Sequence, residues 1–223
     1  EAIAADNLPI SLLVLGGGAV GLELAQVYAR FGVRVSVVES ADRLIGFEEP
    51  ESSALLSAAL TADGIDIYVS RQVVRIDYQH GEFRAELSDG TSLSAEKLLV
   101  SVGRRGELSE LGLETVGLDP NARFLTVDEH MHAGQRLWAV GDVTGRAGFT
   151  HVATYQADIA VRDILGKPGP PADYRALPRV TFTDPEIGVV GLTESQAREA
   201  GLNVRTGLAE VPKSARGWIH KAG

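Results

Sequence analysis

Three closely spaced glycines are the first residues of this sequence whose spacing points to a chemistry. Gly16 permits a tight turn, Gly18 lets main-chain N–H groups approach a diphosphate with no Cβ in the way, and Gly21 lets a helix pack close to the preceding strand. A helix that starts here adds partial positive charge for the phosphates. The spacing G-x-G-x-x-G therefore predicts a dinucleotide-binding loop. Its contacting residues are predicted to be Gly16, Gly17, Gly18, Ala19, Val20 and Gly21.

A carboxylate is expected to bind the sugar of the same dinucleotide. Glu39 ends the next predicted strand, 39 − 21 = 18 residues after the last glycine, close to the expected spacing of about 20. A carboxylate there accepts hydrogen bonds from the adenosine ribose hydroxyls and repels a 2′-phosphate, which favours NAD over NADP. Arg34 and Arg43 lie nearby in the sequence and keep NADP open as the less favoured cofactor.

A strand–helix–strand unit must position these residues. Leu12–Leu15 is wholly apolar, as expected of a parallel strand buried on both faces, and residues 33–38 form a second β-branched run. Spacings of four, three and four predict a helix between them, which ends at Gly32. The core-facing residues of that helix are predicted to be Val20, Leu24, Val27 and Phe31.

The pattern after this unit predicts a larger α/β domain. A helix opens at Pro50 with an apolar stripe, a third strand covers residues 65–69, and residues 98–102 form another buried strand that ends at Gly103. Alternating residues between 74 and 95, with Asp89-Gly90 as a hairpin turn, predict an antiparallel meander inserted into the parallel sheet. The stripe of the second helix consists of Leu55, Leu56, Ala59 and Leu60.

A second block follows and is less regular. A buried strand is predicted at 137–140 and a helix at 152–165, before a linker rich in Gly and Pro at 166–171. Strands are expected at 179–182 and 187–192, with a short helix at 194–200. The fold class is therefore α/β, with a Rossmann-like domain followed by two smaller units.

Composition excludes several classes of function. The net charge of −9 is spread without a basic block, so nucleic acid is not an expected partner. The sequence contains no run of about 18 apolar residues, so no membrane span is predicted. The N-terminus does not resemble a signal peptide, so a cytoplasmic location is expected by default. The chain has no cysteine, which excludes a disulfide, a zinc–thiolate site and a dithiol redox centre within these 223 residues. His130 and His132 lack an evident third ligand, so no metal is predicted.

Three ordered motifs resemble one enzyme family over nearly the whole chain. Residues 16–25 followed by 37–39 resemble the NAD domain of the FAD-dependent pyridine nucleotide–disulfide oxidoreductases, which include dihydrolipoamide dehydrogenase, glutathione reductase and mercuric reductase. Residues 138–143 resemble the second FAD-contacting motif of the family. Residues 182–194 resemble the start of its dimer-interface domain.

The resemblance implies further site residues. Glu23 matches an acidic residue near the nicotinamide, Val73 an apolar residue near the adenine, and Gly103 a glycine that approaches the NAD from the other side. Asp142, after Gly141, matches an aspartate that bonds a flavin ribityl hydroxyl. The segment that touches the flavin corresponds to Phe149, Thr150, His151 and Ala153. Taken alone, Gly141-Asp142 is equally typical of a turn that caps a helix, and His151 of a helix N-terminus.

The family pattern also breaks in places. The family's N-terminal FAD domain with its Cys-x4-Cys pair and its C-terminal His-Glu pair are not found here, so no residue of this chain is predicted to be catalytic. After Gly103 the chain reads Arg104-Arg105-Gly106-Glu107, where the family usually has Arg-x-Pro-Asn. The predicted division is an NAD(P)-binding domain at 1–118, the returning part of an FAD domain at 119–171, and the first part of a dimerisation domain at 172–223.

The sequence thus predicts the NAD-binding part of a homodimeric flavin enzyme similar to dihydrolipoamide dehydrogenase, in which hydride passes between NAD and FAD. Three alternatives stay open. The chain could bind NAD without catalysis, it could belong to an NADP-dependent enzyme similar to mercuric reductase, or it could belong to a flavin NADH oxidase or quinone reductase that lacks the disulfide.

Overall fold

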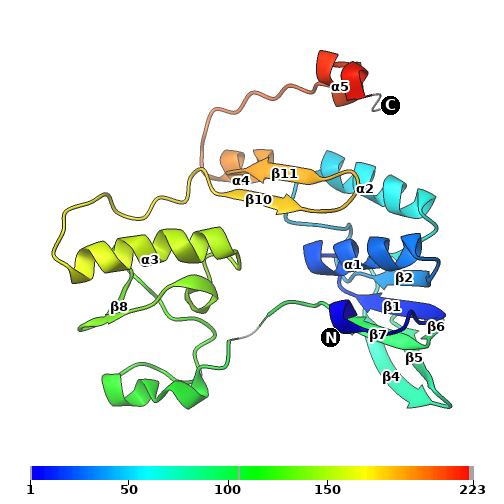
Figure 1. The fold of residues 1–223 in the computed structure, drawn as a ribbon, viewed down its shortest axis with the longest axis horizontal. Helices are drawn as coiled ribbons and strands as arrows, with labels where there is room; N and C mark the ends of the chain where they lie inside the picture. The colour runs from blue at the N-terminus through cyan, green and yellow to red at the C-terminus, as the bar shows by residue number, and fades with distance from the viewer. Residues whose placement is uncertain (1, 105, 221–223) are drawn as a thin grey trace.

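The computed structural model describes residues 2–104 and 106–220, so Arg105 of the altered motif lies outside the described residues. After a short 3-10 helix at Ala2–Ala4, a parallel sheet is formed by β1 (Ser11–Leu15), β2 (Arg34–Val38), β3 (Asp66–Tyr68) and β7 (Lys97–Val100). Its order is β3-β2-β1-β7, with Leu15 opposite both Val38 and Val100. The predicted α/β fold with a parallel sheet is confirmed (Figure 1).

Helix α1 (Ala19–Arg30) packs on this sheet with a face other than the predicted one. Its buried residues are Gly21, Leu22, Ala25, Gln26 and Tyr28. Val20, Val27 and Phe31, predicted to face the core, are 50%, 47% and 66% exposed. The small residues decide the orientation, because only a face with Gly21 and Ala25 lets the helix approach β1 closely. In α2 (Pro50–Ala62), Ser53, Leu56 and Leu60 are buried, whereas Leu55 is exposed.

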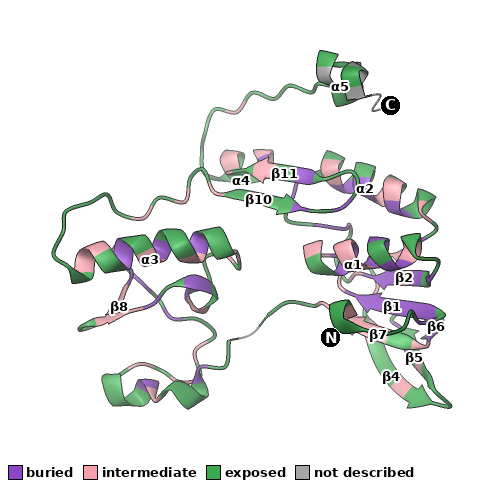
Figure 2. Ribbon diagram, in the orientation of Figure 1, coloured by how far each residue is buried: buried purple, intermediate pink, exposed green. Residues whose placement is uncertain are grey.

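The predicted meander forms a separate antiparallel sheet of β4 (Val73–Gln79), β5 (Glu82–Leu87) and β6 (Ser92–Ala95). Its inner face packs against one side of the parallel sheet. This core consists of Leu13, Leu15, Val38, Ala85, Leu87 and Ala95. The meander therefore covers the parallel sheet instead of continuing it, and most of β4 is exposed (Figure 2).

Strand β7 is not the fully buried strand that the sequence predicted. It lies at the edge of the sheet, beside β1 only, and Val100 and Val102 are 59% and 72% exposed. An apolar run of this length does not reveal whether a neighbour covers it, since periodicity is the same for central and edge strands.

A second lobe follows, with its own core. It contains 3-10 turns at Ser109–Leu111, Leu113–Val116 and Gly141–Thr144, a hairpin of β8 (His132–Gly134) and β9 (Leu137–Trp138), and α3 (Thr150–Ile164). The strand predicted at 137–140 is thus only two residues long. The core of this lobe consists of Leu108, Leu113, Leu125, Val127, Met131, Ala139, Ile159 and Ala160.

The last unit returns to the parallel-sheet domain. Strands β10 (Pro178–Thr181) and β11 (Ile187–Val190) are antiparallel and are followed by α4 (Glu194–Glu199), a 3-10 turn at Val211–Lys213 and α5 (Ala215–His220). Ile187 is buried in the core beneath α1 and α2. The side chain of Arg179 forms a bidentate ion pair of 2.6 and 2.7 Å with Glu48, which is 3% exposed. This hairpin is therefore docked on the first domain. Among the described residues, none of the helices has the length and apolar character needed to cross a membrane.

Candidate dinucleotide site

The three motif glycines are required for different reasons. Gly16 has φ of +102°, and a Cβ there would lie 2.5 Å from the carbonyl oxygen of Ser101. A Cβ on Gly21 would lie 2.3 Å from the carbonyl oxygen of Gly16. Gly18, the residue before α1, has an extended backbone, and a Cβ there would meet no atom within 4 Å. Packing thus explains Gly16 and Gly21, whereas Gly18 faces open space.

The loop is tied to the carboxylate that ends β2. The N–H of Gly17 donates a hydrogen bond of 2.6 Å to Oε2 of Glu39. The other oxygen, Oε1, accepts bonds from the N–H of Ala41 and from the hydroxyl of Ser40 at 2.7 and 3.1 Å. Glu39 is therefore held in one orientation beside the glycine loop, and Gly17 connects loop and carboxylate instead of lining the cavity.

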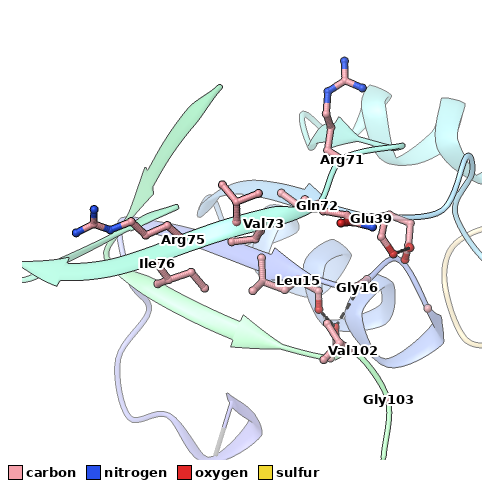
Figure 3. Close-up of a pocket in the computed structure, with 15 residues that line it drawn as sticks. Leu15, Gly16, Glu39, Arg71, Gln72, Val73, Arg75, Ile76, Val102 and Gly103 are labelled. Carbon is pink, nitrogen blue, oxygen red and sulfur yellow. Dashed lines mark hydrogen bonds between the residues drawn. The ribbon is translucent and has the colours of Figure 1, made fainter. Parts of the chain in front are cut away.

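A cavity of about 880 Å³ lies at the carboxyl end of the parallel strands (Figure 3). This edge is where open α/β sheets bind ligands. The cavity brings together five of the predicted site residues, Gly16, Gly18, Glu39, Val73 and Gly103. Its remaining lining residues are Leu15, Val38, Ser40, Arg71, Gln72, Val74, Arg75, Ile76, Ser101 and Val102. Ala19, Val20 and Gly21 lie outside this lining, in the first turn of α1.

Glu23 lies away from this cavity. Its Oε1 accepts a hydrogen bond of 2.8 Å from the N–H of Phe182, and both residues line a separate groove on the outer face of α1. Two residues after Gly21 a helix has turned by about 200°, so Glu23 points away from the sheet that Gly21 contacts. Glu23 was predicted to lie near the nicotinamide, and its proximity to that ring stays a prediction, with Glu23 placed outside the lining of the cavity beside the glycine loop.

The arginines near Glu39 also differ from the expectation. Arg34 begins β2 while Glu39 follows its end, so roughly 16 Å of strand separates them. Arg43 uses Nη2 to donate to the carbonyl oxygen of Gly46 at 2.7 Å. The arginines that line the cavity are Arg71, two residues before β4, and Arg75, within β4. Sequence reasoning missed them because their proximity depends on how the meander folds over the sheet.

A second cavity of about 630 Å³ lies in the second lobe beside Asp142 and Phe149. Asp142 is half exposed, and its Oδ2 pairs with Nη1 of Arg104 at 2.7 Å. Gly141 has φ of +80°, and Ala153 packs beneath it. Of the other predicted residues, Thr150 begins α3, and His151 bonds through Nε2 to the carbonyl oxygen of Pro178 at 3.0 Å. His151 lies in the first turn of α3, and its predicted contact with the flavin stays a prediction.

The turn at Gly141 is held by a residue that sequence reasoning missed. Gln156 is completely buried, and its Oε1 accepts a bond of 2.6 Å from the N–H of Gly141. Its Nε2 donates to the hydroxyls of Thr144 and Tyr174 at 3.2 and 2.9 Å. A glutamine inside an apolar helix face was the available signal, because a buried amide must find partners.

His130 and His132 lie close together in the second lobe, and the bonds of His132 are to two aspartates. His132 bonds through Nδ1 to Asp128 at 2.9 Å and through Nε2 to Asp163 at 2.8 Å. The hydrogen bond to Asp128, followed by the charges of both carboxylates, raises the pKa of His132. In the part of the chain that the structure describes, no group of three or more potential ligands is found.

A parallel sheet with a glycine-rich turn before its first helix, and a carboxylate after the second strand, defines a Rossmann-type protein. Comparison with known families then gives the particular family. A model described as pyridine nucleotide-disulphide oxidoreductase matches residues 1–157, and the model of the dimerisation domain of the same proteins matches residues 177–222. The chain belongs to the pyridine nucleotide-disulphide oxidoreductase family.

Individual relatives agree with this assignment. The chain is 35% identical over 218 residues to a dihydrolipoyl dehydrogenase from Pseudomonas aeruginosa and 39% identical over 221 residues to a mercuric reductase from Streptomyces lividans, covering 97% and 96% of this chain and 46% of each relative. LpdA from Mycobacterium tuberculosis superimposes with a TM-score of 0.89 at 28% identity, over 97% of this chain and 48% of that one. The flavoprotein disulfide reductase RclA from Escherichia coli gives 0.86 at 30% identity, over 98% and 51%. The chain thus spans about half the length of the relatives it matches.

Proposed function

We propose that the cavity beside the glycine loop binds NAD(H), with the diphosphate at Gly18 and the adenosine ribose at Glu39. The observation that carries this proposal is the open space at Gly18. Its backbone conformation, with φ of −87° and ψ of 177°, is one that any residue adopts, and no protein atom needs the space. A glycine that neither backbone strain nor packing requires is explained by a ligand that approaches the main chain.

The sugar end of the cavity favours NAD(H) over NADP(H). Glu39 is fixed as an acceptor by the N–H groups of Gly17 and Ala41, and a carboxylate oxygen with one bond can still accept from a ribose hydroxyl. A 2′-phosphate would place two further negative charges beside this carboxylate. Val73 and Ile76 supply apolar surface in the same cavity, which suits an adenine ring.

The second cavity is proposed to supply part of an FAD site. The half-exposed carboxylate of Asp142 and the Gly141 turn, held by Gln156, suit a polyhydroxyl chain that approaches the main chain. Bound together, the two cofactors supply hydride transfer between nicotinamide and flavin. The residues of this chain bind and orient them, and none is assigned a catalytic role.

The proposed whole activity is that of a homodimeric, cytoplasmic flavin-dependent disulfide oxidoreductase similar to dihydrolipoyl dehydrogenase. The dimerisation-domain match to residues 177–222 supports the dimer. The similarity to mercuric reductase supports the second candidate, an NADP-dependent enzyme of that type. An enzyme without the disulfide and a binding module without catalysis are the remaining alternatives. The division at residues 118 and 171 stays part of this proposal.

A titration followed by NADH fluorescence tests the site. We expect the 223-residue chain to bind NADH and the variant Gly18→Val to bind at least about tenfold more weakly, which corresponds to about 1.4 kcal/mol. The melting temperature of the variant is the control, because a Cβ at this position meets no protein atom within 4 Å. Absence of NADH binding by the unmodified chain, or equal affinity of the variant, would contradict the proposal.

A further inference from the structure

Arg71 is the cation best placed to act on the sugar end of the proposed nucleotide site. Its main-chain N–H donates to the carbonyl oxygen of Glu39 at 3.1 Å, and the N–H of Ser70 donates to that of Ala41 at 2.7 Å. Residues 70–71 therefore run directly beside the segment that carries the carboxylate. Arg34 lies at the opposite end of β2 from Glu39, and Arg43 is bonded within its own loop, so neither competes for this role.

Arg71 is held by a carboxylate from the meander. Its Nε contacts Oδ2 of Asp89 at 2.5 Å, and its Nη1 donates to the carbonyl oxygen of Ser70 at 3.2 Å. Asp89 is itself fixed in the turn between β5 and β6, where Oδ1 accepts from the N–H of Thr91 at 3.0 Å. Bonds from Thr91 and then from Arg71 lower the pKa of Asp89 to about 2, so it is charged at neutral pH. The guanidinium extends away from the glycine loop (Figure 3).

The net charge at the sugar end of the cavity therefore depends on the ion pair between Arg71 and Asp89. Glu39 and Asp89 are negative and Arg71 is positive, which leaves one net negative charge around the sugar position. Without Asp89 the same three positions would be neutral, and the guanidinium would be free to turn. A guanidinium is the side chain best suited to a phosphate because it presents a rigid fork of donors.

We propose that Asp89 sets the preference of this site for NAD(H) over NADP(H) by holding Arg71 away from the sugar. Asp89 acts through Arg71 as a positioning residue, and Arg71 is the residue that would meet a 2′-phosphate. This inference rests on the proposed nucleotide site and goes beyond it, because it assigns the choice of sugar to a pair outside the glycine loop and Glu39.

Binding of NADH and of NADPH to four forms of the 223-residue chain tests this inference: the unmodified chain, Asp89→Asn, Arg71→Ala and the double variant. We expect Asp89→Asn to raise the affinity for NADPH relative to NADH by about twofold to fivefold, the range of an exposed charge pair. The amide oxygen of the variant can still accept from Thr91, so the turn is kept. In the Arg71→Ala background the same substitution should have no effect on the ratio.

A second pair in the meander provides the control. Arg75 also lines the cavity and pairs with Asp77, with Nε and Oδ2 at 2.7 Å, but it lies four residues after Arg71, within β4. Asp77→Asn should leave the NADPH to NADH ratio unchanged. The proposed role of Asp89 would be overturned if Asp89→Asn left the NADPH to NADH affinity ratio unchanged, or raised it equally in the Arg71→Ala background. In either case, NADH binding by the unmodified chain would still support the nucleotide site. Absence of NADH binding would overturn both.

Discussion

Substitution of Gly21 by alanine should destabilise the fold although alanine is the better helix former. The added Cβ would lie 2.3 Å from the carbonyl oxygen of Gly16 and 2.5 Å from Oγ of Ser101. Ser101 could rotate only by losing its bond of 2.7 Å to the carbonyl oxygen of Leu15, and the Gly16 oxygen belongs to the main chain. Helix α1 must therefore move away from β1 by roughly an ångström, since favourable heavy-atom contacts lie near 3.5 Å.

The expected size follows from two opposing effects. Overpacking of this kind costs about 1–3 kcal/mol, and replacement of glycine by alanine within a helix returns up to about 1 kcal/mol. A net loss of about 1–2 kcal/mol corresponds to a fall of roughly 2–8 °C in melting temperature for a chain of this size. Thermal unfolding followed by circular dichroism measures it, with Gly18→Ala as the matched control. Loss of glycine at this N-cap costs up to about 1 kcal/mol and the reduced entropy of the unfolded chain returns about 0.4–1 kcal/mol, so the control should change stability by less than about 0.5 kcal/mol. A Gly21→Ala variant that melts at or above the unmodified chain would refute the reasoning.

Three further substitutions probe other contacts. Arg179→Met leaves Glu48 buried without its partner and should cost about 3–5 kcal/mol in urea unfolding; a loss below 1 kcal/mol would show that the ion pair does not hold the hairpin. Gln156→Leu removes the acceptor of the Gly141 N–H and should lower the unfolding free energy by about 1–3 kcal/mol, and equal stability would contradict the assigned role. Because the pKa of His132 is raised on folding, its contribution is complete below about pH 6.5 and is lost as the pH rises through the folded pKa. His132→Ala should therefore be destabilised more at pH 5.5 than at pH 9, and an NMR titration of the imidazole checks the direction of the shift.

Local patterns predicted the first domain well. The glycine turn, α1 and the parallel strands β1 and β2 follow from features within 30 residues of one another, and their expected arrangement is confirmed. The prediction of the buried face of α1 was wrong because the helical-periodicity rule assigns large apolar residues to the core. In the structure, Gly21 and Ala25 determine which face packs, and Phe31 remains on the surface.

The candidate site also contains residues that the sequence predicted and residues that it missed. Gly18, Glu39 and Val73 were predicted from motif spacing and resemblance, and they line one cavity. Arg71 and Gln156 were missed because their roles depend on contacts with chain segments that no local pattern connects. Arg71 meets a turn 18 residues later, and Gln156 meets a turn 15 residues earlier. Motif spacing finds residues at fixed positions of one strand–helix–strand unit, such as Gly18 and Glu39; it does not find side chains whose partners lie in segments outside that unit.

The second lobe, residues 108–174, joins the rest of the molecule by two chain crossings, one after β7 and one before β10 (Figure 1). The bonds from His151 to the carbonyl oxygen of Pro178 and from Arg104 to Asp142 also join the lobe to the rest, so a rotation about the line through the two crossings would have to break them. Such a swing would alter the distance between Asp142 and the glycine loop while the β10–β11 hairpin stays anchored through Arg179. Two cofactors bound one on each side of this axis would be brought together or separated by a single rotation.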